Sequence, residues 1–131
     1  MEKIRAPWTA TFWEGVEDEK LMYQRCLDCS TAFFPPQKLC AYCSSPQLNW
    51  ERSNGEGSVY SFSIVYKHSP EEFTAELPYV VAIISLDEGY RMSSRLIGKD
   101  PASWSCDDRV TLQFADIPTG TRFPFFTPAA N

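Results

Sequence analysis

The chain has 131 residues, 44% of them hydrophobic and 22% charged, and a formal net charge of −5. This composition is typical of a globular protein with one core of ordinary size and a small additional module. The acidic balance weighs against general nucleic-acid binding, which needs cations along the phosphate chain, and the longest apolar run, Tyr79–Ile84, is too short to span a bilayer.

Residues 1–20 are predicted to form a helical arm. Thr11 and Glu14 have the spacing of a capping box, in which each side chain accepts a hydrogen bond from the other residue's backbone N–H group. A short helix is expected to follow, with the acidic run 17–19 facing solvent. Its apolar side is expected to comprise Phe12, Trp13 and Val16.

Residues 21–52 contain the most specific pattern, two C-x-x-C pairs separated by ten residues. The cysteines are Cys26, Cys29, Cys40 and Cys43. Two such pairs bring four thiolates to one tetrahedral point, and a closed set of soft sulfur ligands favours structural zinc. The same thiolates accept iron in a rubredoxin-like site, whereas disulfides need an oxidising compartment. Strands are expected at 21–25 and 48–52, with a loop between the two pairs, as in a zinc ribbon.

The cysteines also indicate a cellular setting. Five is an odd number, and the sequence shows no basic and apolar leader with a small-residue cleavage site. We therefore expect a reducing, cytoplasmic environment.

Residues 53–127 show strand patterns almost throughout. Ser53–Gly57 is glycine-rich, but it lacks the strand-before, helix-after context of a phosphate-binding loop and is expected to be a turn. Five strands are predicted at 59–66, 79–86, 90–97, 110–114 and 123–126. Asp100 followed by Pro101 predicts a helical turn between the third and fourth strands. This order matches the oligonucleotide/oligosaccharide-binding (OB) barrel, and residues 128–131 are expected to be a frayed tail.

Several motifs occur together along nearly the whole chain. They are Arg25-Cys26-x-x-Cys29, Phe34-Pro35-Pro36, Cys40-x-x-Cys43, Gly55-x-Gly57-x-Val59-Tyr60-Ser61-Phe62, Pro78-Tyr79-Val80-Val81-Ala82, Leu86-Asp87-Glu88-Gly89 and Phe123-Pro124-Phe125. In combination they resemble a family of small proteins that pair a rubredoxin-like zinc ribbon with an acyl-CoA-associated OB-fold. That family was long catalogued as a domain of unknown function.

The resemblance implies a non-catalytic accessory role. Family members occur with thiolases, lipid-transfer-like thiolase homologues or acyl-CoA hydratases, where they bridge subunits and hold or pass a CoA thioester. Two positions depart from the family pattern, because Ser30 and Cys106 stand where the family usually has glycine. Ser30 is expected either to distort the turn formed by the first C-x-x-C pair, called here a knuckle, or to cap a cysteine sulfur. Cys106 is expected to be a free, partly buried thiol with no activating base nearby.

A CoA binder needs a few cations for the phosphates, beside an apolar wall. Period-two alternation in the strand at 90–97 places Arg91 and Arg95 on the face opposite Met92. The candidate CoA contacts are Arg91, Arg95, Lys99, Lys38 and Lys67. The competing interpretation is that they are ordinary solvent-facing cations.

An aromatic and proline-rich stretch lies between the cysteine pairs: Phe33, Phe34, Pro35 and Pro36. So small a ribbon is not expected to bury all four, and exposed apolar residues on a rigid loop are suited to docking a partner. Phe12 and Trp13 are candidates for the same role. The alternative is that these side chains pack onto the barrel and join the two modules.

No catalytic constellation is recognisable in the sequence. The single histidine, His68, lies in a polar loop, where a solvated side chain is the simplest interpretation. We therefore favour an accessory subunit that docks a thiolase-like or acyl-CoA-processing enzyme. Architecture alone would instead suggest a single-stranded nucleic-acid-binding protein, against which the acidity counts, and rubredoxin-like electron transfer is a third possibility.

Overall fold

The computed structural model describes residues 7–118 and 120–129, and the chain divides into two compact units. The first, called here the ribbon unit, extends to Asn54 and also includes Glu88–Tyr90. The second, the barrel unit, consists of Gly55–Asp87 and the chain from Arg91 onward. Within the described ranges, every helix is too short or too polar to cross a membrane.

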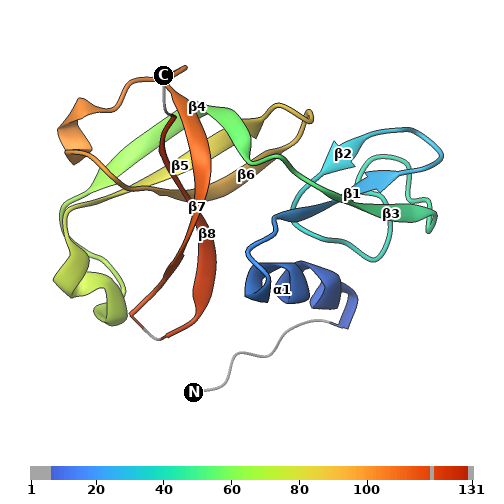
Figure 1. Cartoon of the computed structure of the whole chain (residues 1–131), viewed down its shortest axis with the longest axis horizontal. Coiled ribbons are helices and arrows are strands. Elements are labelled where there is room, and N and C mark those ends of the chain that lie inside the picture. Colours follow the sequence, from blue (N-terminus) through green and yellow to red (C-terminus); the bar gives the residue numbers. More distant parts are fainter. Residues whose placement is uncertain (1–6, 119, 130–131) are drawn as a thin grey trace. The chain divides into compact units, whose positions relative to one another are not determined.

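The ribbon unit pairs one helix with a small antiparallel sheet (Figure 1). The 3-10 turn η1 (Pro7–Thr9) leads into α1 (Ala10–Glu17). The sheet has the order β2-β1-β3, with β1 at Met22–Cys26, β2 at Ala32–Phe33 and β3 at Leu48–Arg52. The strands β1 and β3 agree with the strands predicted at 21–25 and 48–52 and pair with each other, whereas β2 is a short strand in the segment predicted to be a loop.

The predicted capping box is wrong. Helix α1 begins at Ala10 with Thr9 at its N-cap, so Thr11 lies inside the first turn and cannot play the N-cap role. The apolar side of the helix is as predicted for Phe12 and Val16, which are buried, and Trp13 is half-buried against the edge of the Phe12 ring.

The core of the ribbon unit is small and largely aromatic. Tyr23 of β1 stacks on Tyr90 with ring centroids 4.5 Å apart, and Phe12 packs against Phe34 at 5.4 Å. A separate buried cluster near the knuckles contains Cys26, Phe33 and Cys40, with Leu48 packed against it. So few apolar side chains leave the unit in need of another source of stability.

The barrel unit is a closed five-stranded barrel with the order β4-β5-β6-β8-β7. Its strands are β4 (Glu56–Val65), β5 (Tyr79–Leu86), β6 (Arg91–Leu96), β7 (Arg109–Asp116) and β8 (Arg122–Pro128). All pairs are antiparallel except β6 with β8, which meet in parallel at Leu96 and Phe126. The prediction of a mainly β chain with an N-terminal helix, a zinc ribbon and an OB barrel is confirmed.

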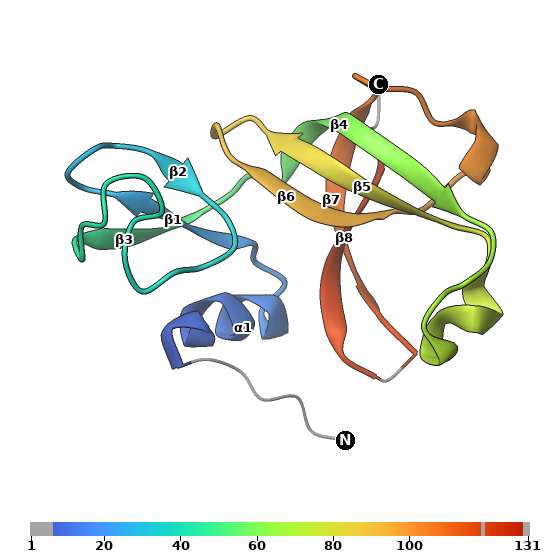
Figure 2. The same cartoon turned by 180° about the vertical axis from the view of Figure 1, so that it is seen from behind.

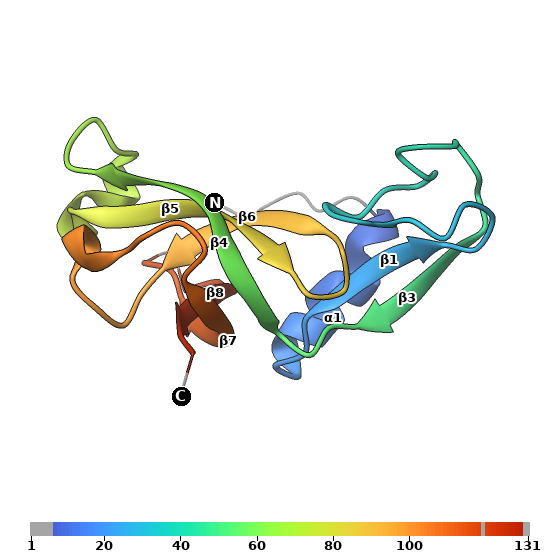
Figure 3. The same cartoon turned by 90° about the horizontal axis from the view of Figure 1, so that it is seen from above.

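The strands of the barrel curve and pair continuously. Figure 2 shows β5 and β6 side by side as one hairpin, and Figure 3 shows β4 bending along its length. A register shift between Val59 and Ser61 marks a β-bulge in β4, which increases local twist and allows the sheet to close.

Two short helical turns connect the strands. The polar segment around His68, between β4 and β5, contains the 3-10 helix η2 (Glu71–Glu76). The predicted turn after Asp100 is confirmed as η3 (Pro101–Ser103), in which the backbone N–H of Ala102 donates to the Asp100 carboxylate over 2.9 Å.

Alternate residues of β5 and β6 fill the barrel. Their buried members are Val80, Ala82, Ile84, Leu86, Met92, Ser94 and Leu96. Gly57 allows β4 and β5 to approach, because a Cβ atom there would lie 2.6 Å from the carbonyl oxygen of Ser85.

Candidate metal centre

The two C-x-x-C segments fold into matching knuckles. In each, the N–H of the first cysteine donates to the carbonyl five residues later, Cys26 to Thr31 over 3.0 Å and Cys40 to Ser45 over 2.8 Å. The residue after the second cysteine donates back to the carbonyl of the first, over 2.9 Å for Ser30 and 3.0 Å for Ser44. These bonds satisfy the backbone groups of both turns and turn the cysteine side chains inward.

Both serines adopt the left-handed conformation, with φ of 65° at Ser30 and 63° at Ser44. Glycine adopts this conformation without steric cost, and non-glycine residues adopt it less readily. Because the two knuckles make equivalent hydrogen bonds, Ser30 does not distort its knuckle, and its N–H bonds the Cys26 carbonyl rather than a sulfur.

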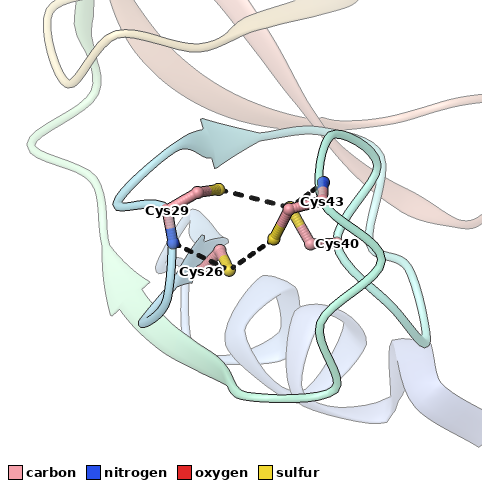
Figure 4. Close-up of side chains that lie close together, drawn as sticks. All are labelled: Cys26, Cys29, Cys40 and Cys43. Carbon is pink, nitrogen blue, oxygen red and sulfur yellow. Dashed lines mark hydrogen bonds between the residues drawn. The ribbon is translucent and has the colours of Figure 1, made fainter.

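The four sulfur atoms converge on one point (Figure 4). All lie within 4.8 Å of one another, and the Cys26–Cys43 and Cys29–Cys40 pairs are separated by 3.6 Å. A zinc ion with sulfurs at about 2.3 Å in a tetrahedron implies sulfur separations of about 3.8 Å. The cysteines are not joined as disulfides, in which the sulfurs would be about 2.0 Å apart. The residues present therefore fit a tetrahedral, four-thiolate metal site.

Backbone N–H groups support the thiolate form of these ligands. The N–H of Cys29 points to the Cys26 sulfur at 3.5 Å, and that of Tyr42 to the Cys40 sulfur at 3.3 Å. The hydrogen bond between the Cys29 sulfur and the Thr31 hydroxyl lowers the pKa of Cys29 to about 6, whereas hydrogen bonds with the neighbouring cysteine sulfurs raise the pKa of Cys43 to about 12. A soft metal ion with four such ligands has no open coordination position, so the site is structural in type.

Arg25 holds the first knuckle in place from β1. Its guanidinium donates to Glu51 over 3.1 Å, to the carbonyl of Ser30 over 2.9 Å and to the carbonyl of Glu88 over 3.3 Å. The Tyr23 hydroxyl donates to the same Glu51 carboxylate over 2.6 Å, and with Arg25 this lowers the pKa of Glu51 below its usual value. Burial is the main cause of the raised pKa of Tyr23.

The structure corrects part of the predicted docking set. Phe12, Phe33 and Pro36 are buried within the ribbon unit and offer no exposed surface for docking, whereas the exposed Pro35 agrees with the expectation that the ribbon does not bury all of residues 33–36. Their rings fill the small hydrophobic clusters that the unit needs for its own core. Pro35 is exposed, whereas Phe34 and Trp13 are half-buried, and docking through these three stays a prediction.

A different set of apolar side chains is exposed around the metal site, and the sequence analysis missed it. Leu27 and Tyr42 occupy the variable positions of the two knuckles, and Leu39 precedes Cys40; their exposed fractions are 62%, 71% and 48%. We call these three residues the knuckle residues. The C-x-x-C spacing could have revealed Leu27 and Tyr42, because the residues between the two cysteines of a pair lie on the outside of the turn.

The candidate CoA cations are placed as follows. Arg91 is exposed on β6 and lies 3.8 Å over the Tyr60 ring, while Arg95 is half-buried and ion-paired with Glu76 over 2.8 Å. Both point to the outer face of the barrel, as the alternation predicts. Lys99 pairs with Asp108 over 3.5 Å and lies over the Trp104 ring. Of the other two, Lys38 lies near the Trp8 ring in the ribbon unit and Lys67 follows β4, both exposed.

Two further residues were singled out from the sequence. His68 is exposed, in the left-handed region with φ of 62°. Cys106 is a free thiol, but it is exposed, so the expectation of partial burial is wrong. It precedes Asp107, which is also exposed and has a φ of 72°, so both residues lie in a turn at the surface of the barrel unit.

Comparison with protein families matches both parts of the chain. Residues 13–49 match the family described as the ChsH2 rubredoxin-like zinc ribbon domain, and residues 50–115 match the ChsH2 C-terminal OB-fold domain.

Several known proteins are similar to the chain. A DUF35 domain-containing scaffold protein of Methanothermobacter thermautotrophicus is 32% identical, over 83% of each chain. A probable enoyl-CoA hydratase alpha subunit of Thermomonospora curvata is 34% identical over 90% of this chain, which spans only 37% of that subunit. The benzoylsuccinyl-CoA thiolase subunit BbsA of Geobacter metallireducens is 30% identical, over 71% of this chain and 60% of that subunit.

A solved structure resembles the whole chain. In the Ltp2-ChsH2(DUF35) aldolase, one chain superimposes with a TM-score of 0.85 and 29% identity, covering 98% of this chain and all of that one.

Proposed function

Because the chain belongs to the ChsH2-type family of DUF35 proteins, which join a rubredoxin-like zinc ribbon to an OB-fold, we propose that it is a non-catalytic accessory subunit. It docks a thiolase-like or acyl-CoA-processing enzyme and helps to hold or shuttle the acyl-CoA substrate of that enzyme. We place this function in the cytoplasm.

The observation that supports the proposal most strongly is the end-to-end similarity to a chain of the Ltp2-ChsH2(DUF35) aldolase. The similarity includes both units of this protein and leaves no part of the compared chain unmatched. The relatives that bear a hydratase or thiolase name are themselves called subunits. An accessory role agrees with a four-thiolate site, in which the metal has no position open to a substrate.

Zinc is the metal that we assign to the four cysteines. Their sulfur separations fit a tetrahedral ion, and zinc bound there would contribute folding energy to a unit with few buried apolar side chains. The knuckles would then be rigid supports for the residues on their outer side.

The knuckle residues are the docking surface that we propose for the enzyme partner. Large apolar side chains with exposed fractions up to 71% on a rigid turn are typical of protein interfaces, and tyrosine is enriched in them. Trp13, Phe34 and Pro35 of the same unit are further candidates.

For the CoA phosphates, we favour Arg91, Lys67 and Lys38 over Arg95 and Lys99. The latter two already have carboxylate partners, Glu76 and Asp108, whose charges an incoming phosphate would have to displace.

Co-purification tests the proposal directly. Untagged native protein is captured by antibody, the associated proteins are identified by mass spectrometry, and the complex is rebuilt from purified components and sized. We expect a thiolase-type enzyme or an acyl-CoA hydratase in stoichiometric amount.

Matched variants locate the contact. Leu27→Ser with Tyr42→Ser should weaken the rebuilt complex at least tenfold, whereas Tyr66→Ser, at another exposed tyrosine, should not. A monodisperse protein that never binds such an enzyme, or that turns over a thioester alone, would contradict the proposed function.

A further inference from the structure

A groove of about 460 Å³ lies on the barrel unit, across β4, β5 and β6 and beside β8. Its lining includes Val81 and Ile83 of β5 and Phe123 and Phe125 of β8. Pockets that bind small molecules usually have volumes of about 300–1,000 Å³ and predominantly apolar walls. The groove has the dimensions of a small-molecule site.

The floor of the groove is apolar where a solvent-facing strand is normally polar. In β5, Val80, Ala82 and Ile84 point into the barrel, so Val81 and Ile83 point out, each with 38% of its surface exposed. An antiparallel strand with one wet face alternates apolar and polar residues, but β5 is apolar on both faces. An outer apolar face of this kind indicates a site that becomes covered by a bound molecule.

Serine hydroxyls flank this apolar floor. The cross-strand register places Ser61 of β4 and Ser93 of β6 on either side of Ile83, and Ser63 beside Val81. All three serines line the groove. They offer hydrogen bonds to isolated oxygen atoms of a ligand without adding charge.

Among the described residues that line the groove, Arg95 is the one cation, and its charge is already compensated. The guanidinium is ion-paired with Glu76 over 2.8 Å and lies 4.3 Å from the centroid of the Tyr79 ring, and only 15% of the side chain is exposed. Arg95 is therefore part of the groove wall, and it provides no uncompensated positive charge to bind a phosphate or a carboxylate.

We propose that this groove binds the hydrocarbon portion of the acyl group of a CoA thioester. The inference rests on the proposed function and extends it, since it specifies which part of the thioester the barrel holds. The face formed by the second and third barrel strands is the one on which OB-folds carry their ligands. Here aliphatic side chains, hydroxyl groups and a compensated cation match an uncharged chain that bears a few oxygen atoms.

The groove is poorly suited to the other ligands of OB-folds. Single-stranded nucleic acids need exposed aromatic rings for stacking and free cations along the backbone. The exposed lining residues of this groove are Val81, Ile83, Ser63 and Ser93; its phenylalanines are buried or half-buried, and Arg95 is held by Glu76.

Calorimetric titration of the full-length, zinc-loaded protein with CoA, acetyl-CoA and octanoyl-CoA tests the proposal. Each buried methylene is worth a factor of about three to four, so octanoyl-CoA should bind at least tenfold more tightly than acetyl-CoA. Ile83→Glu places a charge on the floor, and Ser93→Phe fills the groove. Both should remove the advantage of octanoyl-CoA and leave the affinity for CoA unchanged.

Tyr66→Glu is the matched control, because it replaces an exposed apolar side chain outside the groove with the same charge. It should retain the dependence on chain length, and thermal unfolding establishes that each variant is folded. Equal affinity for CoA and octanoyl-CoA would overturn the inference, as would an advantage that survives in both groove variants. A single-stranded oligonucleotide that binds wild type but not Ile83→Glu would also overturn it.

The co-purification experiment separates this inference from the proposed function. If native protein still carries a thiolase-type enzyme but binds all acyl chains alike, the groove proposal fails alone. If chain-length dependence is present but no such enzyme binds, the proposed docking role fails and the groove proposal stands.

Discussion

Replacement of one metal ligand, Cys40→Ser, should unfold the ribbon unit and leave the barrel unit folded. A structural zinc site contributes about 10–16 kcal/mol, or about 3 kcal/mol per ligand if the four share it equally. A core in a segment of this size rarely supplies more than about 3–5 kcal/mol, and Cys40 is itself buried against the Phe33 cluster. Loss of one ligand therefore removes roughly all the stability that the ribbon unit has.

The assay combines zinc analysis with amide hydrogen exchange. In Cys40→Ser we expect bound zinc well below one per chain, fast exchange in β1 and β3, and native protection in β5 and β7. Cys106→Ser is the matched control, since that thiol is exposed and lies outside the cluster, and its effect should be within about 0.5 kcal/mol. Stoichiometric zinc and unchanged protection of β1 in Cys40→Ser would refute this reasoning.

Three further predictions concern single contacts. Gly57→Ala should lower the free energy of unfolding of the barrel unit, measured in urea, by about 1–3 kcal/mol, because the new methyl group would meet the Ser85 carbonyl oxygen at 2.6 Å. If the variant were as stable as wild type, the close approach of β4 and β5 would not be the reason for glycine at this position. Tyr90→Phe should change stability by less than about 1 kcal/mol, since the buried hydroxyl makes no hydrogen bond of good geometry and has at most a weak interaction with Ser53. Tyr90→Ala should cost about 3–5 kcal/mol, because it removes the ring stacked on Tyr23. Equal losses in the two variants would contradict this prediction. The two hydrogen bonds from Arg109, of 2.9 and 2.8 Å, lower the pKa of Asp87. The ion pair therefore stabilises the fold above the usual carboxyl pKa, and this stabilisation is lost as pH falls through the folded-state pKa of Asp87. NMR titration of Arg109→Gln should show a higher pKa for Asp87 than in wild type, and an unchanged value would count against the pair.

The parts of the fold that sequence could predict are those with a strict period or spacing. The C-x-x-C pairs fix ligand geometry whatever surrounds them, so the metal site follows from four positions. The alternation in β6 correctly placed Arg91 and Arg95 on the outer face. Residue type was equally informative at Asp100 and Pro101. The Asp100 carboxylate accepts a hydrogen bond from the N–H of Ala102, and the fixed φ of Pro101 suits the first position of a helical turn.

What sequence could not give was the tertiary partner of each side chain. Phe33 was a candidate for an exposed docking residue, because a small ribbon was not expected to bury all of residues 33–36. It packs instead with Cys26 and Cys40, a contact that local sequence composition does not indicate. Arg95 looked like a free cation, because its partner Glu76 lies in η2, a distant segment. The capping box failed for a related reason, since the entry turn η1 shifts the helix start to Ala10.

The two surfaces assigned to binding share a physical origin. In the ribbon unit a four-cysteine site that fits a metal ion takes the place of a large core, so Leu27 and Tyr42 are not needed to hold the unit together and remain exposed. In the barrel unit the inner face of β5 already supplies the core, so folding does not require Val81 and Ile83 on its outer face to be apolar. Polar residues at all four positions would satisfy the fold and improve solubility. Their apolar character agrees with the two proposed occupants, an enzyme at the knuckles and an acyl chain on the barrel.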